Sequence, residues 1–79
     1  MQSSQQTVLI TGGATGIGFA IARKFHQAGN QVILVGRSAA ALARASEALP
    51  GAQTCVADVS SAQDRARLVS DYPQVTVLV

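Results

Sequence analysis

Short apolar runs alternate along the chain with longer segments whose hydrophobic positions recur at helical spacing. The runs are continuous and rich in valine and isoleucine, and they cover Val8–Thr11, Gln31–Gly36, Thr54–Asp58 and Val75–Val79. Such runs are typical of strands buried on both faces of a sheet. Their apolar cores open at positions 8, 32, 54 and 75, and this spacing leaves room for one helix between successive strands.

The intervening segments predict three helices, at residues 16–28, 39–49 and 62–71. Each has an expected inward stripe at helical spacing, and the stripes are Ile17, Ile21 and Phe25; Leu42, Ala45 and Leu49; Ala62, Ala66 and Val69. Ser38 and Ser61 stand where N-caps are expected. Asp64 follows Ser61 by three residues, which resembles a capping box with Asp in place of Glu.

The order β-α-β-α-β-α-β predicts an α/β fold in which a parallel, doubly wound sheet is built with right-handed crossovers. Residues 1–79 are expected to form a single unit, since no linker or low-complexity segment interrupts them. The chain ends inside an apolar strand, so we expect it to be the N-terminal portion of a longer domain. We expect the first two helices to cover one face and the third only part of the other, leaving an exposed apolar patch.

Composition narrows the possible functions. The chain is 48% hydrophobic and 13% charged, with a net charge of +2, and this composition excludes intrinsic disorder. The basic residues are scattered and no aromatic residue sits in a basic cluster, which argues against nucleic acid. The single Cys55 permits no internal disulfide and no C-x-x-C metal site. With no signal peptide or apolar run of membrane-spanning length, we expect a cytoplasmic protein.

The candidate chemistry lies in TGGATGIG, residues 11–18, between the first strand and the first helix. Glycines permit a tight turn and let phosphates approach the backbone, while the helix N-terminus offers free N–H groups. The spacing is T-G-x-x-x-G-x-G. It is neither a phosphate-loop motif, because Phe19 stands where Lys is needed, nor the G-x-G-x-x-G fingerprint. The alternative is a plain structural turn.

This glycine stretch resembles that of the short-chain dehydrogenase/reductase family, and the resemblance extends over all 79 residues. Asp58-Val59 looks like the family's Asp-Val pair, whose Asp hydrogen-bonds adenine, and the closing VTVLV looks like the strand that leads into Asn-Asn-Ala-Gly. The resemblance implies a Rossmann-like sheet of strand order 3-2-1-4. It also implies a dinucleotide site at Gly12, Gly13, Thr15, Gly16, Ile17, Gly18, Arg37, Ser38, Asp58 and Val59.

The end of the second strand indicates which nicotinamide cofactor is bound. An acid there favours NAD, whereas an Arg nearby accommodates the 2′-phosphate of NADP. Here Gly36 stands in the acid's place and Arg37 follows, so we predict NADP(H) over NAD, with Ser38 as a second phosphate ligand. Thr15 departs from the Arg or Lys found there in many NADP-preferring members. The alternative is that Arg37 is only a solvated loop charge.

The resemblance implies that the parent protein is an NADP-dependent oxidoreductase of a small alcohol or ketone, and a homo-oligomer. The family's Ser, Tyr and Lys have no counterpart here. Tyr72 is followed four residues later by Thr76 instead of Lys, and we expect it to pack at a helix end. We therefore assign no catalytic residue and expect no turnover by this chain alone. The alternatives are a non-catalytic dinucleotide-binding module and an inert truncated fragment.

Overall fold

The structure, a computed structural model, describes residues 6–75 and 77–78. Strands and helices alternate through this part of the chain, and all observed strand pairings are parallel. The elements are β1 (Thr7–Thr11), α1 (Gly16–Gln27), β2 (Gln31–Gly36), α2 (Ala39–Ala48), β3 (Gln53–Val56), α3 (Ala62–Asp71) and β4 (Val77–Leu78). The three longer strands and three helices confirm the predicted α/β class.

Within the described residues the sheet runs in the order β3-β2-β1-β4. The central pair is in register along its whole length, with Val8 opposite Val32 and Thr11 opposite Val35. Of the fourth predicted run, Thr76 and Val79 lie outside the described residues, and Val8 and Leu9 of β1 pair with Val77 and Leu78. The third strand ends at Val56, two residues earlier than predicted. The Ala57 N–H still donates to the Gly36 carbonyl (2.9 Å), and after this bond the chain leaves the sheet.

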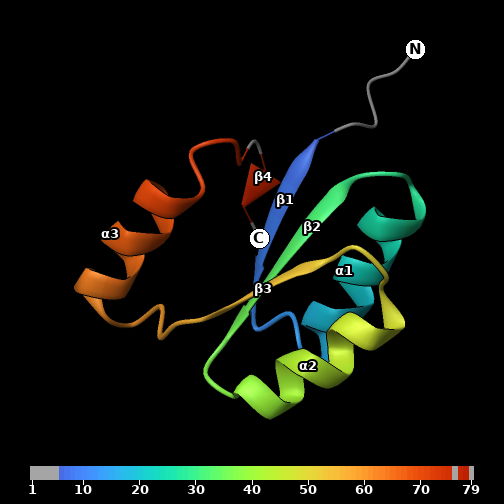
Figure 1. Cartoon of the computed structure of the whole chain (residues 1–79), viewed down its shortest axis with the longest axis horizontal. Coiled ribbons are helices and arrows are strands. Elements are labelled where there is room, and N and C mark those ends of the chain that lie inside the picture. The colour runs from blue at the N-terminus through green and yellow to red at the C-terminus, as the bar shows by residue number, and fades with distance from the viewer. Residues whose placement is uncertain (1–5, 76, 79) are drawn as a thin grey trace.

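Alternate residues of β1 and β2 pack into two separate hydrophobic cores, one on each face of the sheet. On one face Val8, Ile10, Val32 and Leu34 pack with residues of α1 and α2. On the other, Leu9, Ile33 and Val35 pack with Ala57 and Leu68. Figure 1 shows α1 and α2 together on one side of the sheet and α3 on the opposite side. Both faces of β1 and β2 are therefore buried, which is why their sequences are continuous apolar runs.

The predicted helix caps and the second helix stripe are confirmed. The hydroxyl oxygens of Ser38 and Ser61 accept hydrogen bonds from Ala41 N–H (3.2 Å) and Asp64 N–H (3.3 Å). Leu42, Ala45 and Leu49 are all buried, at most 5% exposed.

The predicted stripe of the first helix is wrong at Ile17, and the predicted stripe of the third helix is wrong at all three positions. Ile17 is 81% exposed and Val69 is 74% exposed, while Ala62 and Ala66 are also exposed. The inward residue of α3 is instead Leu68, 7% exposed, with Tyr72 one turn further on. The Leu68–Tyr72 pair has more apolar surface than the two alanines, so its burial determines which side of α3 faces the sheet.

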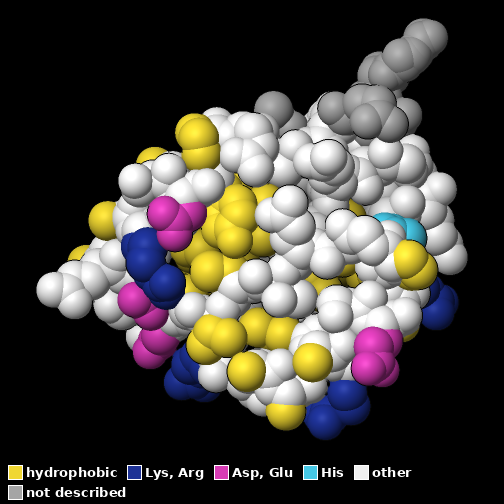
Figure 2. All heavy atoms as spheres, in the orientation of Figure 1, with side chains coloured by type: hydrophobic (Ala, Val, Ile, Leu, Met, Phe, Trp, Pro, Cys, Tyr) yellow, Lys and Arg dark blue, Asp and Glu magenta, His cyan; other side chains and the backbone are white. Residues whose placement is uncertain are grey.

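The face that carries α3 is only partly covered within the described residues. A hollow of about 460 Å³ lies between α3 and the sheet, lined by Leu9, Thr11, Val59, Arg65, Leu68, Val69, Tyr72, Pro73 and Val75. Figure 2 shows apolar side chains gathered in this region, beside charged groups of α3. The apolar patch expected from the helix count is therefore present on the described surface.

Candidate functional site

Backbone geometry explains the four glycines of the β1–α1 turn. Gly12 and Gly16 have positive φ values, 65° and 55°, a conformation that side chains other than glycine's disfavour. Gly13 and Gly18 are required because neither position has room for a Cβ. A Cβ on Gly13 would lie 2.9 Å from Leu34 Cδ2, and one on Gly18 would overlap the Gly12 carbonyl oxygen. The turn therefore presses against the first turn of α1 more closely than any side chain allows.

The turn is attached to the end of β2. The N–H groups of Gly12 and Gly13 both donate to the Val35 carbonyl, at 2.8 Å and 3.3 Å. This bifurcated contact holds the turn beside the carboxyl end of the sheet. It also occupies those two N–H groups, so the buried Gly13 serves the turn and does not offer a donor to a ligand.

The N-terminus of α1 differs from those of the other two described helices. Ser38 caps α2 and Ser61 caps α3, whereas Thr15 makes no side-chain capping bond to α1 in the described structure. The first amide bonded within this helix end is Phe19, which donates to the Thr15 carbonyl (3.2 Å). The preceding N–H groups of the first turn point out of the helix, where the positive end of the helix dipole attracts anions.

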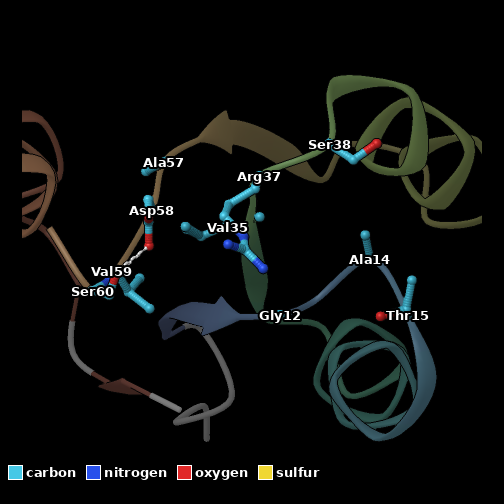
Figure 3. A pocket seen from close by; sticks show the side chains of 11 residues that line it. Gly12, Ala14, Thr15, Val35, Arg37, Ser38, Ala57, Asp58, Val59 and Ser60 are labelled. Carbon is cyan, nitrogen blue, oxygen red and sulfur yellow. Dashed lines mark hydrogen bonds between the residues drawn. The ribbon is translucent and has the colours of Figure 1, made fainter.

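These elements meet at a hollow of about 460 Å³ beside the carboxyl ends of the strands (Figure 3). It is bounded by the glycine turn, by the end of β2 and by the loop after β3. The lining residues are Gly12, Ala14, Thr15, Val35, Gly36, Arg37, Ser38, Ala57, Asp58, Val59 and Ser60. A crevice outside the carboxyl ends of parallel strands is where open α/β sheets bind their ligands.

Six of the ten predicted site residues line this hollow: Gly12, Thr15, Arg37, Ser38, Asp58 and Val59. Gly16, Ile17 and Gly18 form the first turn of α1 just outside the lining, and Gly13 is buried beneath it. The sequence pattern did not single out Ser60 as a site residue. Its position two residues after an Asp, ahead of a predicted helix, is the pattern of a side-chain-bonded turn and was the available signal.

Asp58 is held as a carboxylate by Ser60. The Ser60 hydroxyl and N–H both donate to Asp58 Oδ1, at 2.6 Å and 3.0 Å. These bonds, the hydroxyl first, lower the pKa of Asp58 below its ordinary value of 3.8, and the Arg37 charge adds a smaller lowering that partial burial opposes. Asp58 therefore offers a negative acceptor at neutral pH on the wall opposite the α1 N-terminus.

Arg37 supplies the positive charge of the hollow. Its guanidinium reaches toward Gly12 (Figure 3), and it is exposed, with no hydrogen bond or ion pair to the residues at 6–75. Ser38 follows it at the rim. Its oxygen accepts from Ala41 N–H, which leaves the hydroxyl hydrogen available as a donor. One end of the hollow therefore provides donors and positive charge, and the other provides a carboxylate beside the apolar Val59.

In the part of the chain that the structure describes, three or more His, Cys, Asp or Glu residues are nowhere grouped as metal ligands. Across the same residues, each helix is too short or too polar to cross a membrane.

Tyr72 lies at the C-cap of α3 against the second core, as predicted, and its pKa is raised chiefly by burial.

The fold and the hollow together define a dinucleotide-binding type of α/β domain. The model of the short-chain dehydrogenase family matches residues 6–79. The chain is also 42% identical over 83 aligned positions to the Bacillus subtilis (strain 168) protein DltE, described as an uncharacterized oxidoreductase; all of this chain and 33% of DltE are covered. The chain therefore belongs to the short-chain dehydrogenase/reductase family, whose members are oxidoreductases that bind nicotinamide dinucleotides.

Solved structures agree with this assignment. A short-chain dehydrogenase/reductase family protein is 34% identical with a TM-score of 0.88, over 92% of this chain and 32% of its own. A 2-keto-3-deoxy-D-gluconate dehydrogenase from Streptococcus agalactiae is 27% identical with a TM-score of 0.86, over 96% of this chain and 32% of its own. The chain thus spans about one third of the length of the relatives it matches.

Proposed function

We propose that this chain is the N-terminal, NADP(H)-binding portion of an oxidoreductase of the family. The observation that carries the proposal is the uncapped N-terminus of α1, which lies beside a turn compressed by Gly12 and Gly18. A pyrophosphate carries the negative charge that such a helix end binds. It would occupy the space beside Gly12 that a side chain on the turn would fill.

The distribution of charge supports NADP(H) over NAD(H). β2 ends at Gly36, where a ribose-binding acid would repel a 2′-phosphate, and Arg37 follows with an exposed guanidinium that makes no hydrogen bond to the described residues. A guanidinium binds a phosphate through two parallel charge-assisted hydrogen bonds. Ser38 would donate its hydroxyl hydrogen to the same group. Asp58 and Val59 would then receive the adenine, the carboxylate by hydrogen bonding and the valine by contact.

In the longer protein the bound cofactor would exchange a hydride with a small alcohol or ketone. The residues of this chain would contribute by binding. They would bind the phosphates, favour NADP(H) over NAD(H) and hold the adenosine end of the cofactor in place. We assign no catalytic residue within residues 1–79. Homo-oligomeric assembly and a cytoplasmic location stay predictions from the sequence.

Direct binding measurements test the proposal. We expect the chain to bind NADPH more tightly than NADH when each is followed by its own fluorescence. The Arg37→Ala variant should lose most of this preference, since hydrogen bonds to charged groups contribute about 1.5–3 kcal/mol, or roughly 10- to 150-fold in Kd. Arg44→Ala is the matched control, because Arg44 is exposed on α2 and outside the hollow.

Each possible result is informative. Equal affinity for the two cofactors in the unmodified chain would refute the NADP(H) assignment and favour the solvated-charge alternative for Arg37. Binding of neither cofactor would favour the inert-fragment alternative. Tight binding without any turnover by the full-length protein would favour a non-catalytic dinucleotide-binding module.

A further inference from the structure

Polar side chains of α3 hold the loop that carries Asp58 into the hollow. The Asp58 N–H donates to Asp64 Oδ2 at 2.7 Å. Arg65 Nη1 donates to the Val59 carbonyl at 2.7 Å, and Arg67 Nη2 donates to the Val56 carbonyl at 3.0 Å. We name Asp64, Arg65 and Arg67 the α3 clamp. Three backbone groups of residues 56–59 are therefore held by side chains of α3.

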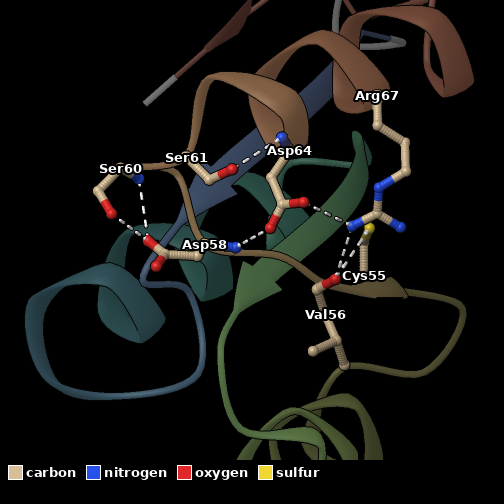
Figure 4. A network of polar contacts seen from close by, with 7 residues as sticks. All are labelled: Cys55, Val56, Asp58, Ser60, Ser61, Asp64 and Arg67. Carbon is tan, nitrogen blue, oxygen red and sulfur yellow. Dashed lines mark hydrogen bonds and ion pairs between the residues drawn. The ribbon is translucent and has the colours of Figure 1, made fainter.

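Asp64 is the centre of this network (Figure 4). One carboxylate oxygen accepts the Asp58 N–H, and the other lies 3.7 Å from Arg67 Nη2. In the predicted capping box this carboxylate would bind the Ser61 N–H. In the structure the Ser61 N–H donates to the Asp58 carbonyl instead, at 2.9 Å. The carboxylate is therefore committed to the loop and not to its own helix end.

The contact determines how Asp58 meets a ligand. The Asp58 side chain is already bonded to Ser60, so its direction follows the backbone of this short loop. That backbone is held on one side by the last sheet bond of Ala57 and on the other by Asp64. The bond from Asp64 is short and charge-assisted, the stronger class of hydrogen bond. Without it the Asp58 N–H has no partner, although Arg65 still holds the Val59 carbonyl and the Ser61 N–H still bonds the Asp58 carbonyl.

We propose that Asp64 is a positioning residue of the dinucleotide site. It does not line the hollow. It holds the Asp58 backbone so that the Asp58 carboxylate and Val59 face the adenine end. This inference rests on the NADP(H)-binding function proposed above, and it concerns the adenine end alone, so the pyrophosphate end should not depend on Asp64.

The test compares Asp64→Ala, Asp64→Asn and Asp71→Ala. Asp71 is an exposed acid of the same helix that makes no hydrogen bond or ion pair to the described loop residues 56–59. Binding of NADPH is followed by fluorescence. Binding of inorganic pyrophosphate, which has no adenine, is followed by the NMR shifts of the Ile17 and Gly18 amides. We expect Asp64→Ala to weaken NADPH binding about 5- to 10-fold, less than the roughly 10- to 150-fold of a lost direct charge-assisted bond, because Asp64 acts only through the Asp58 backbone. Pyrophosphate binding should be unchanged.

Asp64→Asn should stay within about twofold of the parent, because the amide oxygen can still accept the Asp58 N–H. Asp71→Ala should match the parent for both ligands. If the unmodified chain binds no NADPH, the proposed function itself fails. If it binds and Asp64→Ala behaves as Asp71→Ala, or weakens both ligands equally, or if Asp64→Asn is as weak as Asp64→Ala, the positioning role is refuted.

Discussion

Gly18→Ala tests the claim that close contact between the glycine turn and α1 creates the proposed phosphate site. The new Cβ would overlap the Gly12 carbonyl oxygen and lie 2.8 Å from its carbon. Ordinary carbon contacts lie at about 3.5–4.0 Å, so the turn must move by roughly an ångström. That movement is opposed by the 2.8 Å bond from Gly12 N–H to the Val35 carbonyl.

The expected loss of stability is about 2 kcal/mol. Overpacking of this kind costs about 1–3 kcal/mol, and weakening the Gly12–Val35 bond adds about 1 kcal/mol. The better helix propensity of Ala returns somewhat less than 1 kcal/mol. In a domain of this size the midpoint of thermal unfolding should fall by roughly 10 °C, measured by circular dichroism. Binding of NADPH, followed by fluorescence, should fall at least tenfold at temperatures where the variant is folded.

Two other glycines serve as controls. Gly36→Ala places its Cβ 3.6 Å from Leu42 Cδ2, an ordinary contact, and should change stability little. Gly51→Ala has open space but a φ of 88°, so it should destabilise by about 1–2 kcal/mol while leaving NADPH affinity unchanged, since it lies in the turn after α2. If Gly18→Ala unfolds like the parent, or loses no more affinity than Gly51→Ala, the close-contact argument is wrong.

Three further predictions address the core, a helix cap and the acid of the hollow. Leu42→Ala should lower the free energy of unfolding by about 2–5 kcal/mol, because Leu42 is 1% exposed; a loss below 1 kcal/mol in urea unfolding would contradict the packing. Ser61→Ala should destabilise by about 1 kcal/mol through its lost cap, and exposed Ser70→Ala, the control, should not. Ser60→Ala should raise the pKa of Asp58 in a ¹³C NMR titration. The folded-state pKa of Asp58 is lowered. The stability that this carboxylate contributes is therefore present above its unfolded pKa and is lost as the pH falls below about 4. If the pKa of Asp58 is the same in Ser60→Ala as in the parent, the role of the Ser60 contact is contradicted.

Much of the fold follows from local pattern. The strand Gln31–Gly36 and the helix Ala62–Asp71 have the predicted bounds, because Gly, Pro and Ser stand at their ends. The orientation of α3 was not predictable in the same way. Ala66 and Val69 fit a helical stripe as well as Leu68 and Tyr72 do, and only contact with the sheet decides between them.

The candidate site was also partly visible in the sequence. The glycine spacing, Arg37 and Asp58 all stand just after apolar runs, and parallel strands bring those ends to one edge of the sheet. Gly13 and Asp64 show what the pattern misses. Gly13 reads as one more glycine of the loop, yet its N–H is taken by Val35. Asp64 reads as a cap, yet it bonds six residues back along the chain.

By itself, the sequence determined the order of elements, the parallel sheet and the position of the glycine turn, because these depend on periodicity, on glycine's conformational freedom and on neighbours a few residues away. Only the tertiary structure decided which helix faces turn inward and which N–H groups are already bonded. It also brought Asp64 to the Asp58 backbone. Those outcomes depend on competition among distant groups for the same partner or the same buried surface, and such competition is settled only when the chain has packed.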